Sequence, residues 1–245
     1  DDDRRARAPR FGEGARQALI DRGEIGGDIV VRVMGVGHEG LRMRAVRLAA
    51  AARALKRASG AQAPFSLAFL TDRRRIANPE PVIAAMPAGS AVIYRDYDDP
   101  RRAAIARRYH SLCKGRGVLF LIAADPQLAA NIGADGVHWP ARWPRTQKTT
   151  GLITAAAHGA ADLVRAAALG ADVALLSPVF PTQSHPGAEP IGATRFSMLA
   201  ARSPVPVLAL GGVDATNAAG LKGANVAGIA AIGAFCAARG AEGPL

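Results

Sequence analysis

The sequence predicts an α/β protein built as a compact (β/α)8 TIM barrel with an N-terminal helical appendage. From residue 66 onward, eight short apolar runs recur, separated by helical or loop segments. The runs are continuous rather than alternating, as is typical of strands that a parallel sheet buries on both faces. About eight strand–helix units within 245 residues favour a closed barrel over an open sheet.

The N-terminal part of the chain differs in character from the rest. It contains a strand-like apolar run at residues 28–34 and an alanine- and arginine-rich helical pattern at residues 41–58. The segment 59–64, Ser-Gly-Ala-Gln-Ala-Pro, then interrupts the pattern, because glycine and proline are the strongest local breakers. We therefore expect a basic appendage at residues 1–63 and the barrel at residues 64–245.

The predicted strands and helices follow one another through the barrel. The strands are expected at residues 67–70, 91–94, 118–122, 136–138, 151–153, 173–176, 205–210 and 228–232. Helix-like stretches lie at residues 100–114, 158–169, 192–202 and 214–222. Residues 141–148 offer almost no helix, and the residues from 236 onward are too few for a closing helix. We expect the helix at 41–58 to cover the outer surface that an eighth helix would otherwise cover.

Composition excludes several classes of protein. Hydrophobic residues make up 49% of the chain, which excludes disorder of the whole chain. No apolar run approaches the roughly 18 residues that a spanning helix requires, so we expect no membrane partner. The two cysteines, Cys113 and Cys236, are too few for a disulfide scaffold and indicate a reducing, cytoplasmic location.

The chain is strongly basic. It has 31 Lys and Arg against 20 Asp and Glu, a formal net charge of +11. The arginines are scattered through helical stretches and do not alternate with aromatic residues, as a single-strand binding surface would require. We therefore assign the charge to solvated helix faces and do not expect a nucleic-acid partner; a phosphorylated small substrate is a further alternative. The sequence leaves open whether the protein is a homo-oligomer.

Glycines close the last two predicted strands. In a (β/α)8 barrel the active site lies at the carboxyl ends of the strands, and backbone N–H groups after strands seven and eight frequently bind phosphate. Gly211 and Gly212 follow the seventh run, and Ile232 and Gly233 close the eighth. Glycine pairs also make simple turns, but the presence of glycines at both strand ends favours a phosphate pocket.

Four segments of the predicted barrel carry a resemblance to a known family. They are Gly133–His138, Gly170–Asp172, Ser177–Thr182 and Leu208–Val213. In this order they resemble thiamine phosphate synthase and its sister, the thiazole tautomerase, over about Leu67–Phe235. The resemblance implies a TIM barrel that joins hydroxymethylpyrimidine diphosphate to thiazole phosphate, releases pyrophosphate and uses Mg²⁺ in thiamine biosynthesis.

The resemblance also implies residues for the diphosphate and the metal. Arg95 matches the family's diphosphate-binding arginine, and Asp125 matches a metal-ligating aspartate. The chain departs from the family nearby: Tyr97 stands where a lysine is expected, and Ala124 stands where an asparagine is expected. Trp143 replaces a second metal-ligating aspartate. These departures weaken the implied Mg²⁺–diphosphate site.

At the end of the pocket that would bind thiazole phosphate, more residues match those of the family. The hydroxyls of Thr182 and Ser184 match the family's Thr-x-Thr-Lys loop, in which His185 replaces the lysine. We expect His185 to contact phosphate as a partly charged substitute. The remaining residues expected at this phosphate are Gly211, Gly212, Ile232 and Gly233.

Three functions fit this pattern. The leading one is the synthase reaction, with Arg95 as a catalytic residue. The second is a tautomerase, in which the resemblance implies that His158 after the fifth strand shuttles a proton. An imidazole suits proton transfer near pH 7; the alternative is that His158 caps or begins the next helix. The third is a barrel that has lost catalysis and only binds a phosphorylated ligand.

One further motif lies in the N-terminal segment. Gly35-Val-Gly37-His-Glu-Gly40 matches the G-x-G-x-x-G fingerprint of dinucleotide-binding proteins. The acidic residue that such sites carry about 20 residues further on is missing. We therefore expect a glycine-rich turn here.

Overall fold

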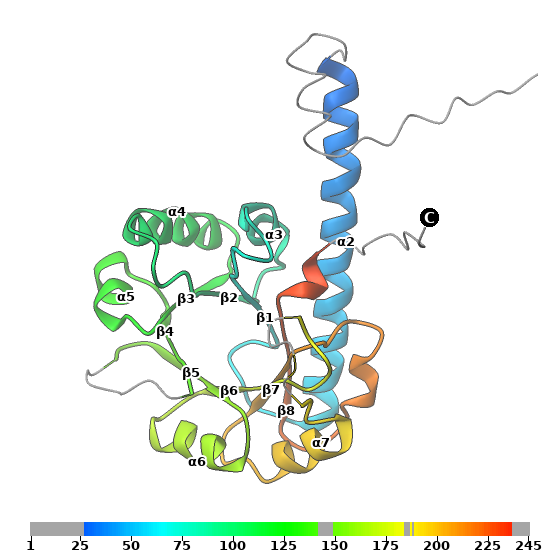
Figure 1. Cartoon of the computed structure of the whole chain (residues 1–245), viewed down its shortest axis with the longest axis vertical. Helices are drawn as coiled ribbons and strands as arrows, with labels where there is room; N and C mark the ends of the chain where they lie inside the picture. Colours follow the sequence, from blue (N-terminus) through cyan, green and yellow to red (C-terminus); the bar gives the residue numbers. More distant parts are fainter. Residues whose placement is uncertain (1–26, 142–148, 184–186, 188, 237–245) are drawn as a thin grey trace, which may run out of the picture. The chain divides into compact units, whose positions relative to one another are not determined.

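The computed structural model describes residues 27–141, 149–183, 187 and 189–236, with side chains from residue 40 onward. The chain divides into two compact units, residues 1–40 and 41–245. In the second unit, eight parallel strands follow one another around a closed barrel, and the first strand pairs with both the second and the eighth (Figure 1). The predicted fold class is confirmed.

The strands of the barrel match the predicted apolar runs. They are β1 Leu67–Leu70, β2 Ala91–Tyr94, β3 Leu119–Ala123, β4 Gly136–Trp139, β5 Leu152–Ala157, β6 Val173–Leu176, β7 Val207–Leu210 and β8 Val226–Ala231. Leu70, Ile93 and Leu175 belong to one buried cluster, which fills the barrel, whereas Phe69 and Val92 belong to a second cluster shared with the helices. Each strand is buried on both faces, which explains why its sequence is continuously apolar.

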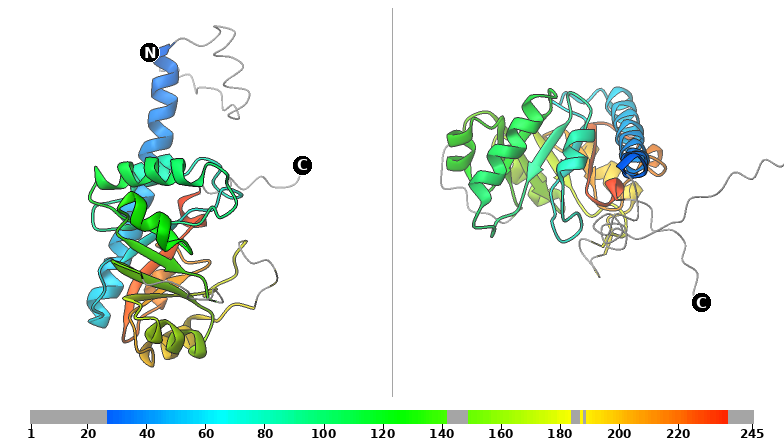
Figure 2. Two further views of the ribbon diagram at one scale, coloured as in Figure 1. Left: turned by 90° about the vertical axis from the view of Figure 1, so that its left-hand side faces the viewer. Right: turned by 90° about the horizontal axis from the view of Figure 1, so that it is seen from above.

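Short helices surround the barrel (Figure 2). They are α3 Glu80–Ala85, α4 Arg102–Lys114, α5 Pro126–Ile132, α6 Ala160–Ala168 and α7 Ala193–Ala201, with 3-10 turns η1 Ala218–Gly220 and η2 Gly233–Phe235. The prediction of a helix at 214–222 was wrong, since only η1 forms there. The Asp214 carboxylate accepts the backbone N–H groups of Thr216 and Asn217, so these local bonds replace helical ones.

Helix α2, Gly27–Ser59, corrects two expectations for the N-terminal part of the chain. The run at 28–34, expected as a strand, is helical. The prediction failed because the periodicity of a short continuous apolar run does not distinguish a strand from a helix. The segment Gly35–Gly40, expected as a turn, is also part of this helix. Among the described residues, no helix combines the length and the apolar character that crossing a membrane requires.

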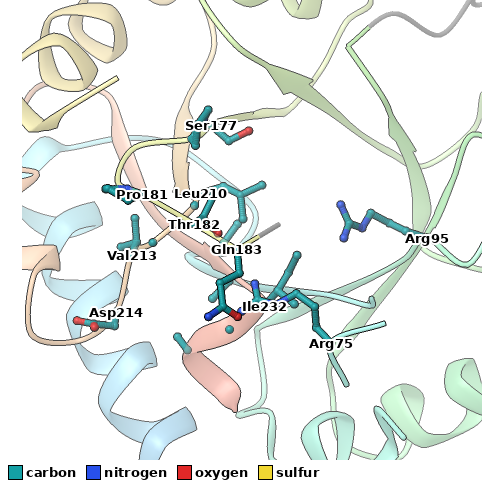
Figure 3. Close-up of a pocket in the computed structure, with 17 residues that line it drawn as sticks. Arg75, Arg95, Ser177, Pro181, Thr182, Gln183, Leu210, Val213, Asp214 and Ile232 are labelled. Atoms are coloured by element: carbon teal, nitrogen blue, oxygen red, sulfur yellow. The ribbon is translucent and has the colours of Figure 1, made fainter. Parts of the chain in front are cut away.

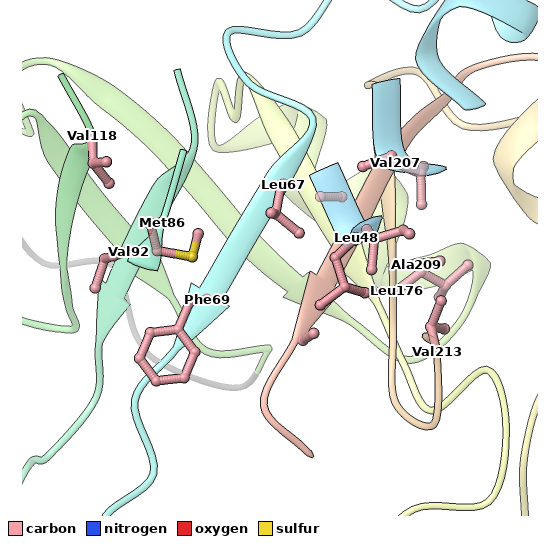
Figure 4. Close-up of a cluster of buried hydrophobic side chains, with 14 of the residues drawn as sticks. Leu48, Leu67, Phe69, Met86, Val92, Val118, Leu176, Val207, Ala209 and Val213 are labelled. Carbon is pink, nitrogen blue, oxygen red and sulfur yellow. The ribbon is translucent and has the colours of Figure 1, made fainter. Parts of the chain in front are cut away.

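Within the second unit, α2 packs on the barrel through one apolar stripe. The buried residues of the stripe are Leu41, Ala45, Leu48, Ala49, Ala52 and Leu55. They share a buried cluster with Leu67 and Val207, which Figure 4 labels together with Leu48. At the end of the helix, the Ser59 hydroxyl donates to the carbonyl oxygen of Val226 at 2.7 Å. This part of α2 therefore covers the wall near β1, β7 and β8, whereas the domain boundary at residue 63 stays a prediction.

Candidate active site at the carboxyl ends of the strands

A cavity of about 310 Å³ opens where several strands end (Figure 3). Its lining consists of Arg75, Arg95, Ser177, Pro178, Pro181, Thr182, Gln183, Leu210, Gly211, Gly212, Val213, Asp214, Ala230, Ala231, Ile232, Gly233 and Ala234. The two arginines lie on one side of the cavity in Figure 3, and Pro181, Val213 and Asp214 lie on the other. The structure thus brings most of the predicted phosphate residues together with Arg95. Ser184 and His185 lie outside the described residues.

Arg95 follows β2 and is fixed to the end of β1. Its backbone N–H donates to the Thr71 hydroxyl at 2.9 Å, and its side-chain Nε donates to the Thr71 carbonyl oxygen at 3.1 Å. Its Nη2 lies 3.7 Å from a carboxylate oxygen of Asp72. Burial lowers the pKa of Arg95, while Tyr97 and Asp72 oppose this effect. A guanidinium group nevertheless stays protonated at neutral pH, so Arg95 presents a fixed positive charge to the cavity.

Arg75 is a second cation of the cavity, and sequence reasoning missed it. It comes from the loop between β1 and α3, where the Asp72 carbonyl accepts its backbone N–H at 3.0 Å. A Cβ atom added to Gly233 would lie 2.5 Å from Nη2 of Arg75, so the guanidinium lies directly against Gly233. The available signal was three consecutive arginines after the polar strand end Thr71–Asp72.

The glycine pair after β7 allows the loop after β6 to come close. Gly212 has φ +65°, in the left-handed region. A Cβ atom added to it would lie 2.6 Å from the carbonyl oxygen of Pro181 and 2.7 Å from Cβ of Phe180. The Phe180 N–H also donates to the carbonyl oxygen of Gly211 at 3.0 Å. These contacts hold the loop that carries Thr182 at the cavity; backbone contacts to phosphate stay a prediction.

His158 lies next to the cavity but does not line it. Its Nδ1 is 2.8 Å from the carbonyl oxygen of Ser177, which does line the cavity. A carbonyl oxygen only accepts, so Nδ1 bears the hydrogen and Nε2 is the basic nitrogen of the neutral ring. The backbone N–H of His158 donates to the Asp162 carboxylate at 2.8 Å, just before α6. Both roles considered for His158, proton transfer and helix initiation, are compatible with this position.

His138 is a buried polar residue of β4. Its Nδ1 lies 2.9 Å from the Thr154 hydroxyl on β5. Burial, and secondly the charge of Arg95, lower the pKa of His138 to about 3. The ring is therefore neutral at pH 7 and is not a proton donor under these conditions.

Comparison with known proteins agrees with the fold. The model of the family described as thiamine monophosphate synthase matches residues 67–235. The chain belongs to this family. It is 33% identical over 190 residues to a putative thiamine-phosphate synthase of Geobacter sulfurreducens, covering 72% of this chain and 89% of the relative. It is 29% identical to the thiamine-phosphate synthase of Bacillus velezensis, covering 65% and 77%, respectively.

A solved structure shares the fold of this family member. It is a thiamine phosphate pyrophosphorylase from Pyrococcus furiosus, with a TM-score of 0.56 and 24% sequence identity. The match covers 68% of this chain and 85% of that chain. At this identity, the likeness supports the barrel architecture alone.

The described residues of this family member offer few side-chain ligands for the Mg²⁺ that the resemblance implies. The Asp125 carboxylate caps α5 by accepting the Leu128 N–H at 2.8 Å, and Ala124 offers no side-chain ligand. The Asp214 carboxylate accepts three hydrogen bonds from Thr216 and Asn217. Within the described part of the chain, no three His, Cys, Asp or Glu side chains gather into a metal site. Mg²⁺ in phosphate-binding sites is usually held by one or two carboxylates together with substrate phosphates and water, so a role of Asp125 in holding it stays a prediction.

Proposed function

We propose that this chain is a thiamine phosphate synthase that joins hydroxymethylpyrimidine diphosphate to thiazole phosphate and releases pyrophosphate. The observation that carries the proposal is the pair of guanidinium groups, Arg75 and Arg95, facing the loop of Thr182 across one cavity. Arginine binds phosphate oxygens through several N–H groups at once, so this cavity suits two phosphorylated small substrates. The names of the curated relatives support the same reaction.

The two substrates take different ends of the cavity in this proposal. The diphosphate lies at Arg95, near the ends of β1 and β2. The phosphate monoester of the thiazole lies near the ends of β6, β7 and β8. Its contacts come from Thr182, Gly211, Gly212, Ile232 and Gly233 on the described chain.

The bond exchange needs electrostatic help at the leaving group. The bond between the methylene carbon of the pyrimidine and the diphosphate oxygen breaks, and the pyrophosphate leaves with the electron pair. The ring nitrogen of the thiazole then bonds to the methylene carbon, which gives thiamine phosphate. Arg95, held by Thr71 and Asp72, stabilises the charge that develops on the departing oxygen. No proton has to move in this exchange.

A specific observation favours one alternative, the tautomerase. With Nδ1 of His158 bonded to the Ser177 carbonyl, Nε2 is a basic nitrogen close to the cavity. Such a nitrogen can take a proton from one position of a thiazole carboxylate phosphate and return it to another. His158→Ala would abolish that isomerisation. It would not stop the synthase reaction, because that reaction needs no proton acceptor.

The test is pyrophosphate release by the full chain with both substrates and Mg²⁺ present. We expect Arg95→Ala to lower kcat/KM by about 100-fold or more, the usual effect of removing a transition-state donor. The matched control is Arg101→Ala, an arginine with a 71% exposed side chain near the same strand end. Turnover that is indifferent to Arg95→Ala contradicts the site assignment. Isomerase activity lost in His158→Ala, without pyrophosphate release, supports the tautomerase, and tight phosphate-ligand binding with neither activity supports a binding protein.

A further inference from the structure

We infer that Arg75, whose guanidinium lies against Gly233, is the residue that recognises the phosphate of the thiazole substrate. The inference rests on the proposed function, because it assigns a specificity residue to one of its two substrates. The predicted phosphate residues follow β6, β7 and β8. They give no indication that an arginine from the loop after β1 takes part.

The loop after β1 is built to hold Arg75 in place. The Asp72 carbonyl accepts the backbone N–H groups of Arg75 at 3.0 Å and Ile76 at 2.8 Å. The Asp72 carboxylate accepts the N–H of Arg74 at 3.2 Å and also lies 3.7 Å from Nη2 of Arg95. One aspartate thus orders the loop of the first arginine and contacts the second.

The side chain of Arg75 ends at β8. A Cβ atom added to Gly233 would lie 2.5 Å from Nη2, 3.2 Å from Cζ and 3.2 Å from Nη1 of Arg75. Three guanidinium atoms close to one point show that the group covers the Cα of Gly233. Arg75 and Gly233 line the same cavity, together with Gly212 and Thr182. The positive charge of Arg75 therefore lies beside Gly233, one of the residues assigned to the thiazole phosphate.

The described lining of the cavity carries more positive than negative side chains, Arg75 and Arg95 against Asp214. Asp214 is the acidic residue among the lining residues. Its carboxylate accepts the N–H and hydroxyl of Thr216 and the N–H of Asn217, at 2.7 to 3.1 Å. Two arginines and one aspartate give the described lining a net positive charge, which favours a phosphate in the cavity.

The test is equilibrium binding to the full chain, measured by calorimetry without turnover. The probes are thiazole phosphate, its dephosphorylated alcohol and inorganic phosphate. We expect Arg75→Gln to lower the affinity for thiazole phosphate about 10- to 100-fold, the usual effect of losing charged hydrogen bonds. The affinity for the alcohol should stay within about twofold of the wild-type value. Arg74→Gln, the same change at the exposed neighbour, should leave all three affinities within twofold, and Arg75→Lys should recover part of the loss.

Gly233→Ala provides a second, independent variant. The added methyl shifts the guanidinium but leaves its charge in place, so we expect a smaller loss of thiazole phosphate affinity than in Arg75→Gln. In the Arg75→Gln background the same substitution should add little, because both changes act on one contact.

The outcomes separate this inference from the proposed function. An unchanged phosphate affinity in Arg75→Gln, or an equal loss for phosphate and alcohol, overturns the role of Arg75. In a further outcome, the wild-type protein binds inorganic phosphate through Arg75 and fails to bind thiazole phosphate. That result would support phosphate binding by Arg75 and contradict thiazole phosphate as the substrate. If it binds none of the phosphate probes, both are contradicted.

Discussion

His138 couples the stability of the barrel to pH. It is 3% exposed, and burial together with Arg95 lowers its pKa to about 3 from an ordinary value of 6.5. Between these two values the unfolded chain binds a proton that the folded chain does not. The free energy of unfolding should therefore decrease as pH falls from 6.5 towards 3, by at most about 1.4 kcal/mol per pH unit from this residue.

Urea denaturation at pH 7, 6, 5 and 4 measures this contribution. His138→Asn keeps a hydrogen-bonding side chain but cannot take up the proton, so its stability should decline less steeply over this range. The comparison uses the slope against pH, which is independent of any loss of stability common to all pH values. Equal slopes for the wild type and the variant would show that His138 is not the source of the acid sensitivity.

Single residues also show how far the sequence predicts the site. Arg95 and the glycines after β7 and β8 could be found because each directly follows a predicted strand. Arg75 could not, because its role depends on a turn around Asp72 and on a contact with Gly233 at the other end of the barrel sequence. The sequence reasoning also missed that the Asp125 carboxylate caps α5, which Asp followed by Pro indicates; its metal role stays a prediction.

At the scale of elements, α2 stabilises the barrel through its buried stripe. Leu48 is 2% exposed and shares a buried cluster with Val207, whereas Met43 on the same helix is 52% exposed. Leu48→Ala should lower the free energy of unfolding by about 2–5 kcal/mol, because it leaves a cavity in packed surroundings. Met43→Ala is the matched control and should change it by about 0.5 kcal/mol or less. Urea denaturation that finds the same small loss for both variants would contradict this packing.

The elements differ in how well their sequences reveal them. The strands were predictable because burial on both faces leaves continuous apolar runs. The helices α3 and α5, of six and seven residues, are too short to show a helical period. The strand predicted at 28–34 is helical, because its apolar run has no decisive period. The helix predicted at 214–222 does not form, because the Asp214 side chain accepts hydrogen bonds from the nearby backbone.

At the scale of the whole molecule, closure of the barrel creates the site. β1 pairs with β8, so the loop after the first strand meets the end of the last. This is how Arg75 reaches Gly233, although 157 residues of chain separate the two positions in the printed numbering. The net charge of +11 also gains meaning, because part of it lies in the cavity rather than on outer helix faces.

The most direct test of the account is the product balance of the full chain incubated with hydroxymethylpyrimidine diphosphate, thiazole phosphate and Mg²⁺. Mass spectrometry should detect one thiamine phosphate for each pyrophosphate released, and omission of either substrate should stop both. A protein that binds thiazole phosphate yet forms no thiamine phosphate above the protein-free rate would contradict the proposed synthase.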